Sequence, residues 1–112
     1  MITIHHNPRC STSRKALELL QAQGQPLEIV DYLKTPLTVD ALRSLIEVAG
    51  LSVREAMRTK EPIYQQLGLD GADEAALLQA MAAHPVLLNR PFVTTPKGTR
   101  LCRPFERIHE IL

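Results

Sequence analysis

Cys10 is the residue of this sequence with the clearest capacity for covalent chemistry. It follows a short apolar segment and directly precedes a stretch with helical periodicity, so the partially positive end of a helix should face its sulfur. Arg9 and Arg14 add positive charge close by in the chain. These conditions lower a thiol pKa and make the thiolate a usable nucleophile, whereas the alternative is a small buried side chain that only packs. The pattern therefore predicts a reactive thiolate at Cys10.

The second cysteine, Cys102, is not an obvious partner for the first. Ser13 occupies the position that a C-x-x-C motif would give to a second thiol, so an oxidised or substituted Cys10 must be relieved by Cys102 or by an external thiol. Cys102 adjoins Arg103 near the end of a predicted strand, where neighbouring side chains point to opposite faces. If Arg103 faces the site, Cys102 faces away, which favours a buried strand thiol over a resolving one.

Two histidines lie just upstream of the candidate nucleophile. His5 and His6 are adjacent in a predicted strand and cannot easily chelate one ion, and no Cys/His set with zinc spacing follows, so we expect no metal site. His6 is closer to the loop and could interact electrostatically with Cys10. An ordinary strand-end histidine is the alternative that the residues alone leave open.

Three arginines could form a local site for an anion. Arg58, Arg90 and Arg103 each fall at the boundary of a predicted element, and two of them precede a proline. A tetrahedral oxyanion needs several planar donors that converge on it, which arginine supplies better than lysine. Taken singly, each is a solvated surface charge, so only a reason to place them together makes them a site.

These residues must be positioned by elements whose periodicity can be followed along the chain. Strands are predicted at 2–5, 27–31, 92–95 and 100–102, where apolar or alternating segments end at turn residues. Helices are predicted from Ser11 or Thr12 to Gly24, from Thr38 to Gly50, from Ser52, from Pro62 to Gly68, from Asp73 to just before Pro85, and from Pro104 onward. The order βαβ, helical block, ββα predicts an α/β, thioredoxin-like fold. We expect a single domain over 1–112 with a helical insertion around 38–84.

Composition narrows the class of protein further. A chain of 112 residues with 45% hydrophobic residues fits one globular domain that needs no disulfide or metal to fold. The 13 basic and 12 acidic residues give a net charge of +1, which provides no global field for nucleic acid or a membrane. No stretch is apolar enough to span a membrane, and the first residues lack the pattern of a signal peptide. With two distant cysteines in addition, we expect a cytoplasmic protein with reduced thiols.

Several blocks of the sequence together resemble the glutaredoxin-dependent arsenate reductases. These blocks are H-N-P-R-C-S-T-S-R at 6–14, Y-L-K-T-P at 32–36, S-V-R-E-A-M-R-T-K-E-P at 52–62, H-P-V-L-L-N-R-P at 84–91 and G-T-R-L-C-R-P at 98–104. They span nearly the whole chain in the order of that family. Ser11 departs from the glycine of some members, and Arg9 stands where relatives vary. Neither departure removes a reacting group.

The resemblance implies a thioredoxin-like fold and a role for each matching residue. Those roles are catalytic nucleophile for Cys10, binding of arsenate and its reduced product for Arg58, Arg90 and Arg103, support of the thiolate for His6, proximity to the sulfur for Ser13, and a preceding cis peptide bond for Pro91. The implied co-substrate is glutathione, and the implied transient partner is glutaredoxin. The resemblance implies no bound metal or cofactor.

Two other functions within the same broad family are alternatives. One is a regulator that binds RNA polymerase, but its redox-sensing members carry C-x-x-C, and Ser13 replaces the second cysteine here. The other is an arsenate-reductase-like thiol oxidoreductase with a different substrate. It would keep Cys10, with or without the arginines, and the sequence does not separate it from an arsenate reductase.

Overall fold

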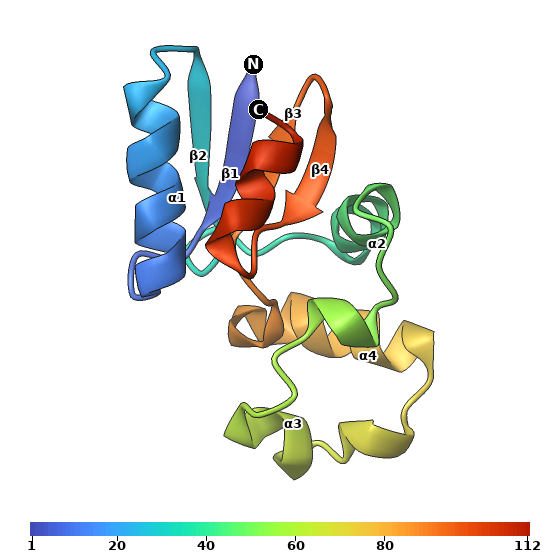
Figure 1. The fold of residues 1–112 in the computed structure, drawn as a ribbon. Helices are drawn as coiled ribbons and strands as arrows, with labels where there is room; N and C mark the ends of the chain where they lie inside the picture. Colours follow the sequence, from blue (N-terminus) through green and yellow to red (C-terminus); the bar gives the residue numbers. More distant parts are fainter. The chain divides into compact units, whose positions relative to one another are not determined.

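A four-stranded mixed sheet forms the centre of one unit of the computed structural model, which describes residues 1–112. The unit comprises Met1–Thr35 and Arg90–Leu112. Its strands are β1 (Ile2–His6), β2 (Leu27–Asp31), β3 (Phe92–Thr95) and β4 (Gly98–Leu101), in the order β2-β1-β3-β4 (Figure 1). β1 and β2 are parallel, and the other pairs are antiparallel. The predicted α/β class and the βαβ…ββ strand order are confirmed.

Helix α1 (Ser11–Ala22) and the 3-10 helix η4 (Phe105–Glu110) contact each other and the sheet. Along β1, residues alternate between buried and partly exposed, as expected for a strand with one face on the core. The buried face joins α1 and η4 in one apolar cluster made of Ile2, Ile4, Ala16, Leu20, Val93, Cys102, Ile108 and Ile111. The last helix is a 3-10 helix that buries Ile108, and Ile111, directly after it, is buried as well.

The start of α1 differs from the prediction. Ser11 or Thr12 was expected to cap this helix, but Cys10 is the N-cap residue, with extended backbone angles (φ −96°, ψ 122°), and Ser11 is the first helical residue. The physical reason is the preceding turn, in which the N–H of Cys10 donates to the carbonyl of Asn7 at 3.0 Å. This turn starts the helix earlier and puts the cysteine itself at the helix end.

Residues Pro36–Asn89 form the second unit, and the predicted helical insertion around 38–84 falls within it. Its elements are α2 (Val39–Val48), η1 (Arg54–Ala56), α3 (Pro62–Gln66), η2 (Leu69–Gly71), α4 (Glu74–Ala83) and η3 (Pro85–Leu87). Thr38 and Asp73 cap α2 and α4 as predicted, each accepting a backbone N–H with its side-chain oxygen. The capping box of Ser52 and Glu55 also forms both of its bonds, but only the short η1 follows it.

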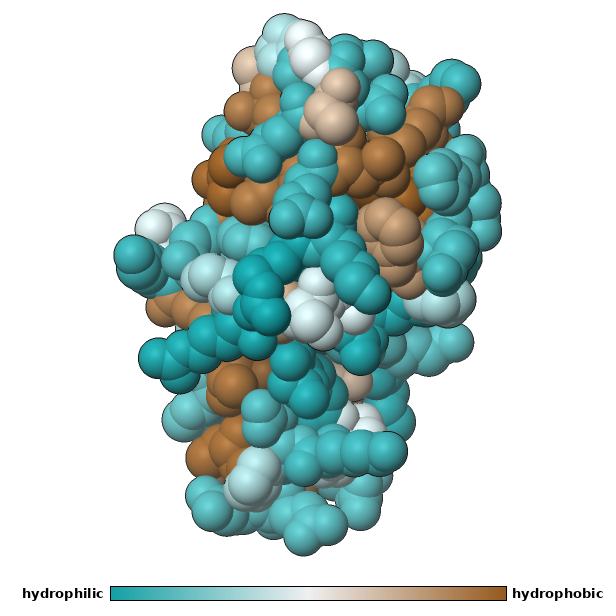
Figure 2. Space-filling view, turned by 60° about the vertical axis from the view of Figure 1, so that its left-hand side comes forward, coloured by the Kyte–Doolittle hydropathy of each residue, from teal (hydrophilic) through white to brown (hydrophobic).

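The surface carries few large exposed apolar side chains. Beyond Met1 these are Ile29, Val48, Leu67 and Val86, and each lies in or directly beside a different element. Figure 2 shows one face, on which polar residues predominate and apolar residues form separate patches. Among the helices, none combines the length and the apolar character needed to cross a bilayer.

Candidate active site

The β3–β4 hairpin delivers two of the predicted arginines to the same end of the sheet. Its ladder continues past the strands, because the N–H of Cys102 donates to the carbonyl of Pro91 at 2.9 Å. The next residue outward on one side is Arg90, and on the other side it is Arg103. Both arginines precede a cis proline, at the Arg90–Pro91 and Arg103–Pro104 bonds. The first of these is the cis bond that the family resemblance implies.

Cys10 reaches the same end of the sheet on the loop that follows β1. Asn7 organises this loop: its Oδ1 accepts the N–H of Arg9 at 2.9 Å, and its carbonyl accepts the N–H of Cys10 at 3.0 Å. The guanidinium of Arg14 donates to the carbonyl of Pro8 at 2.8 Å. Sequence reasoning treated Arg14 only as a charge and missed Asn7. The Asn-Pro dipeptide was the available signal, because asparagine commonly bonds the backbone two residues ahead.

The sulfur of Cys10 lies among positively polarised groups. Nη1 of Arg103 lies 3.6 Å from Sγ of Cys10 and also donates to the carbonyl of Arg90 at 3.2 Å. Burial is the largest influence on the thiol and raises its pKa, but the N–H groups of Ser13 and Thr12 and the guanidinium of Arg90 together outweigh it. The net effect is a Cys10 pKa below the usual value for a thiol. The structure therefore brings Cys10, Arg90 and Arg103 together.

His6 and Ser13 form a buried pair behind the nucleophile. Nδ1 of His6 lies 2.6 Å from Oγ of Ser13, and the N–H of Asn7 donates to the same oxygen at 3.1 Å. Burial lowers the pKa of His6, and the charge of Arg14 lowers it further, while Asp31 opposes the shift. His6 is therefore hydrogen-bonded to Ser13, and its lowered pKa favours the neutral form of the imidazole ring.

Arg58, the third predicted arginine, belongs to the second unit. Its N–H donates to the carbonyl of Leu87 at 2.8 Å, and the N–H of Asn89 donates to the carbonyl of Ala56 at 2.8 Å. This short antiparallel bridge fixes the backbone at Arg58. Its guanidinium lies 3.5 Å from Oε1 of Glu61. The role of Arg58 in anion binding stays a prediction.

A further arginine, Arg54, organises the same unit. Its guanidinium donates to the hydroxyl of Tyr64, to the carbonyl of Leu69 at 3.3 Å and to the carbonyl of Ala72 at 3.2 Å. It thereby ties η1 to α3 and η2. Arginine suits this position because its fork of donors can serve several acceptors at once.

Cys102 is the buried strand thiol that alternation predicted. It has 0% exposure and belongs to the apolar cluster, and burial raises its pKa to about 12. A thiol of this kind is a poor nucleophile at neutral pH. Relief of a substituted Cys10 by an external thiol is the pathway that this burial favours.

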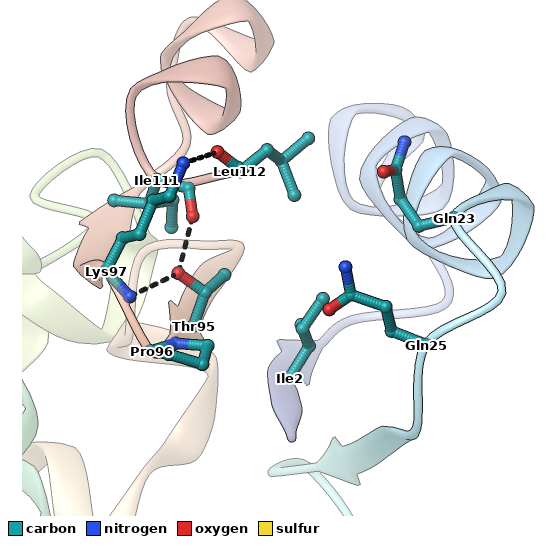
Figure 3. A pocket seen from close by; sticks show the side chains of 8 residues that line it. All are labelled: Ile2, Gln23, Gln25, Thr95, Pro96, Lys97, Ile111 and Leu112. Atoms are coloured by element: carbon teal, nitrogen blue, oxygen red, sulfur yellow. Dashed lines mark hydrogen bonds between the residues drawn. The ribbon is translucent and has the colours of Figure 1, made fainter.

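One cavity lies away from this chemistry. It has a volume of about 160 Å³ and adjoins Ile2, at the opposite end of β1 from the Cys10 loop. Gln23 and Gln25 lie on one side of it and Lys97 on the other (Figure 3). Nζ of Lys97 donates to the carbonyl of Leu112 at 2.7 Å. No cysteine lines this cavity. No cluster of three or more His, Cys, Asp or Glu residues that could bind a metal ion occurs in the structure.

Comparison with known proteins gives a consistent set of relatives. Residues 5–111 match the ArsC family. The chain is 49% identical over 113 residues to the arsenate reductase of Escherichia coli (strain K12), covering 99% of this chain and 80% of that protein. It is 46% identical over 113 residues to the arsenate reductase of Rhizobium meliloti (strain 1021), covering 99% and 81%. Among solved structures, the arsenate reductase from Vibrio cholerae is similar with a TM-score of 0.93 and 42% identity, covering 99% and 97%.

Proposed function

Because the chain belongs to the ArsC family and has its thioredoxin-like fold, we propose that it reduces arsenate to arsenite, with Cys10 as the nucleophile. The observation that carries this proposal is the contact between Cys10 and Arg103, at 3.6 Å, beside the guanidinium of Arg90. Two guanidinium groups beside a thiolate can hold an oxyanion within reach of the sulfur, and the thiolate can then attack it.

The first step is the attack of the Cys10 thiolate on arsenic. A sulfur–arsenic bond forms, one arsenic–oxygen bond breaks, and the departing oxygen leaves as water after taking up protons. Arg90 and Arg103 neutralise the negative charge on the remaining oxygens. We assign the same task to Arg58, as the third arginine of the set that the family resemblance implies.

The second step reduces arsenic with two electrons. The thiol of glutathione displaces another oxygen of the adduct as water. Both arsenic–sulfur bonds then break as one sulfur–sulfur bond forms. One of the two bonding electron pairs joins the sulfurs in a disulfide, and the other stays on arsenic, which takes up water and leaves as arsenite. Cys10 is left as a mixed disulfide with glutathione. A glutaredoxin thiolate attacks the glutathione sulfur and releases Cys10 as a thiolate. Because the proposed reaction needs external thiols, we propose that it takes place in the reducing cytoplasm.

The test is arsenate-dependent oxidation of NADPH with glutathione, glutathione reductase and a glutaredoxin supplied. We expect turnover by the native chain, none by Cys10→Ser, and nearly unchanged turnover by the matched control Cys102→Ser. Loss of activity in Cys102→Ser without unfolding would show that the buried thiol resolves Cys10. Absence of turnover by the folded native chain with several glutaredoxins would overturn the assignment of arsenate as substrate.

A further inference from the structure

A tight turn carries the residue that precedes the nucleophile. The N–H of Cys10 donates to the carbonyl of Asn7 at 3.0 Å, which closes a β-turn in the connection between β1 and α1 (Figure 1). Pro8 and Arg9 are the central residues of this turn, and both are exposed. Oδ1 of Asn7 accepts the N–H of Arg9 at 2.9 Å. The backbone of Arg9 is therefore fixed beside Cys10, whereas its side chain is left in contact with solvent.

The guanidinium of Arg9 differs from the other arginines near the sulfur in having no partner within the chain. Nη1 of Arg103 lies 3.6 Å from Sγ of Cys10, and Nη1 of Arg14 donates to the carbonyl of Pro8 at 2.8 Å. Arg9 takes part in none of the ion pairs of the structure, and its one side-chain-assisted contact is made by its backbone N–H. An exposed cation of this kind is available to an anion from solution.

Carboxylates are scarce around this cation. No Asp or Glu occurs among residues 1–17, and the groups that shift the pKa of Cys10 include no carboxylate. Asp31 ends β2 at the same end of the sheet, but its Oδ1 already accepts the N–H groups of Leu33 and Lys34, at 3.1 and 3.3 Å. The turn therefore presents positive charge that the chain itself leaves largely uncompensated.

Glutathione has the charge and the length to use this cation. The tripeptide carries two carboxylates against one ammonium group, so it is a net anion at neutral pH, and so is its disulfide. Its glycine carboxylate belongs to the residue next to its cysteine, and consecutive Cα atoms are about 3.8 Å apart. When the sulfur of glutathione meets Sγ of Cys10, that carboxylate comes within reach of a long side chain on the adjacent residue. The planar fork of arginine matches a carboxylate in geometry.

We propose that Arg9 is a recognition residue for glutathione: its guanidinium binds a carboxylate of the tripeptide while the sulfur of glutathione meets Cys10. This inference rests on the proposed function in taking glutathione as the thiol that reaches Cys10. It gives the co-substrate a binding group separate from Arg90 and Arg103, which we assign to the oxyanion. Arg9 then determines which thiols the chain accepts and takes no part in the transfer of electrons.

This recognition can be measured without arsenate, by the reaction of Cys10 with glutathione disulfide. The Cys10 thiolate attacks one sulfur, a new sulfur–sulfur bond forms, the original one breaks, and one glutathione leaves as a thiolate with the electron pair. The comparison is bis(2-hydroxyethyl) disulfide, which is uncharged. The ratio of the two rates cancels any change in the thiolate fraction of Cys10, so it reports how the site recognises charge. Mass spectrometry assigns the modified cysteine, and circular dichroism checks folding.

We expect Arg9→Gln to lower this ratio about threefold at low ionic strength, the size of one exposed ion pair. Arg9→Lys should retain most of the ratio, because the charge remains. Arg107→Gln is the matched control, since it removes the same charge from a partly exposed arginine in η4, and its ratio should equal that of the native chain. An unchanged ratio in Arg9→Gln, or an equal fall in Arg107→Gln, would overturn the proposal.

Turnover provides a second measurement, which separates glutathione from arsenate. In the coupled assay with NADPH, Arg9→Gln should raise the KM for glutathione about threefold and leave the KM for arsenate unchanged. A rise in the KM for arsenate alone would assign Arg9 to the oxyanion and overturn the proposal. Exchange with glutathione disulfide needs no arsenate. A native chain that shows the charge selectivity but no turnover would therefore refute arsenate as the substrate and support the glutathione site.

Discussion

Replacing Arg103 by glutamine should raise the pKa of Cys10, because the substitution removes a positive charge that lies beside the sulfur. Nη1 of Arg103 is 3.6 Å from Sγ of Cys10. Glutamine retains a polar side chain and a donor but carries no charge. The change therefore isolates the electrostatic part of the contact from its packing.

The size of the effect follows from the distance and the exposure. Two unit charges at 3.6 Å attract by about 1 kcal/mol with the dielectric constant of water and by about 5 kcal/mol with an effective constant of 20. The Arg103 side chain is exposed, so the lower value governs. About 1 kcal/mol corresponds to a shift of about 0.7 in pKa. The thiolate fraction below the midpoint should then fall about fivefold.

The assay is the alkylation rate of Cys10 as a function of pH at low ionic strength, where exposed charges are least screened. Arg107→Gln is the matched control, since this partly exposed arginine acts on Cys102 and Glu110. Its alkylation curve should superimpose on that of the native chain. An unchanged midpoint in Arg103→Gln, or equal shifts in both variants, would refute a local electrostatic role for Arg103.

Three further predictions concern the loop, the second unit and the buried thiol. Asn7→Ala removes the acceptor for the Arg9 N–H and should lower the free energy of unfolding by about 1 kcal/mol, measured by urea denaturation; no change would mean that the turn does not depend on this side chain. Arg54→Met leaves the acceptors on α3 and η2 without their donor and should cost about 2–3 kcal/mol in the same experiment, whereas a loss within 0.5 kcal/mol would show that water replaces the guanidinium. Cys102 has a folded-state pKa of about 12, above its unfolded value, so the unfolded chain loses the proton first and stability should fall as pH rises from about 8.5 towards 12, by up to about 1.4 kcal/mol per pH unit. The same pH series in Cys102→Ala should lack this fall, and an identical slope in both proteins would assign it to other groups.

The bounds of an element agree with the prediction where turn residues in the local sequence mark both of its ends. The strands at 27–31 and 92–95 have the predicted bounds because turn residues flank each of them. β4 was predicted at 100–102 but runs Gly98–Leu101, since pairing with Thr95 draws Gly98 into the ladder. That pairing is a tertiary contact, which a local pattern does not contain.

The candidate site likewise has some features that a local sequence pattern predicts and others that depend on tertiary contacts. Cys10 could be identified from its position between a strand and a helix. Its contact with Arg103, however, joins residues 93 apart and depends on the register of two ladders. The role of Asn7 depends on the path of a single loop. The three arginines were identified as site residues only through the resemblance to a family, because residue type alone does not distinguish them from surface charges.

The hairpin of β3 and β4 has a consequence for how this chain can vary over evolution. Its turn at Pro96 and Lys97 lies at the far end of the sheet from the nucleophile, and surface turns of this kind commonly tolerate insertions and deletions. A change of one residue here that shifted the register would turn every side chain of one strand to the opposite face. Arg90 and Arg103 would then no longer reach Cys10 together. Natural variants should therefore conserve the length of this turn more strictly than its residues.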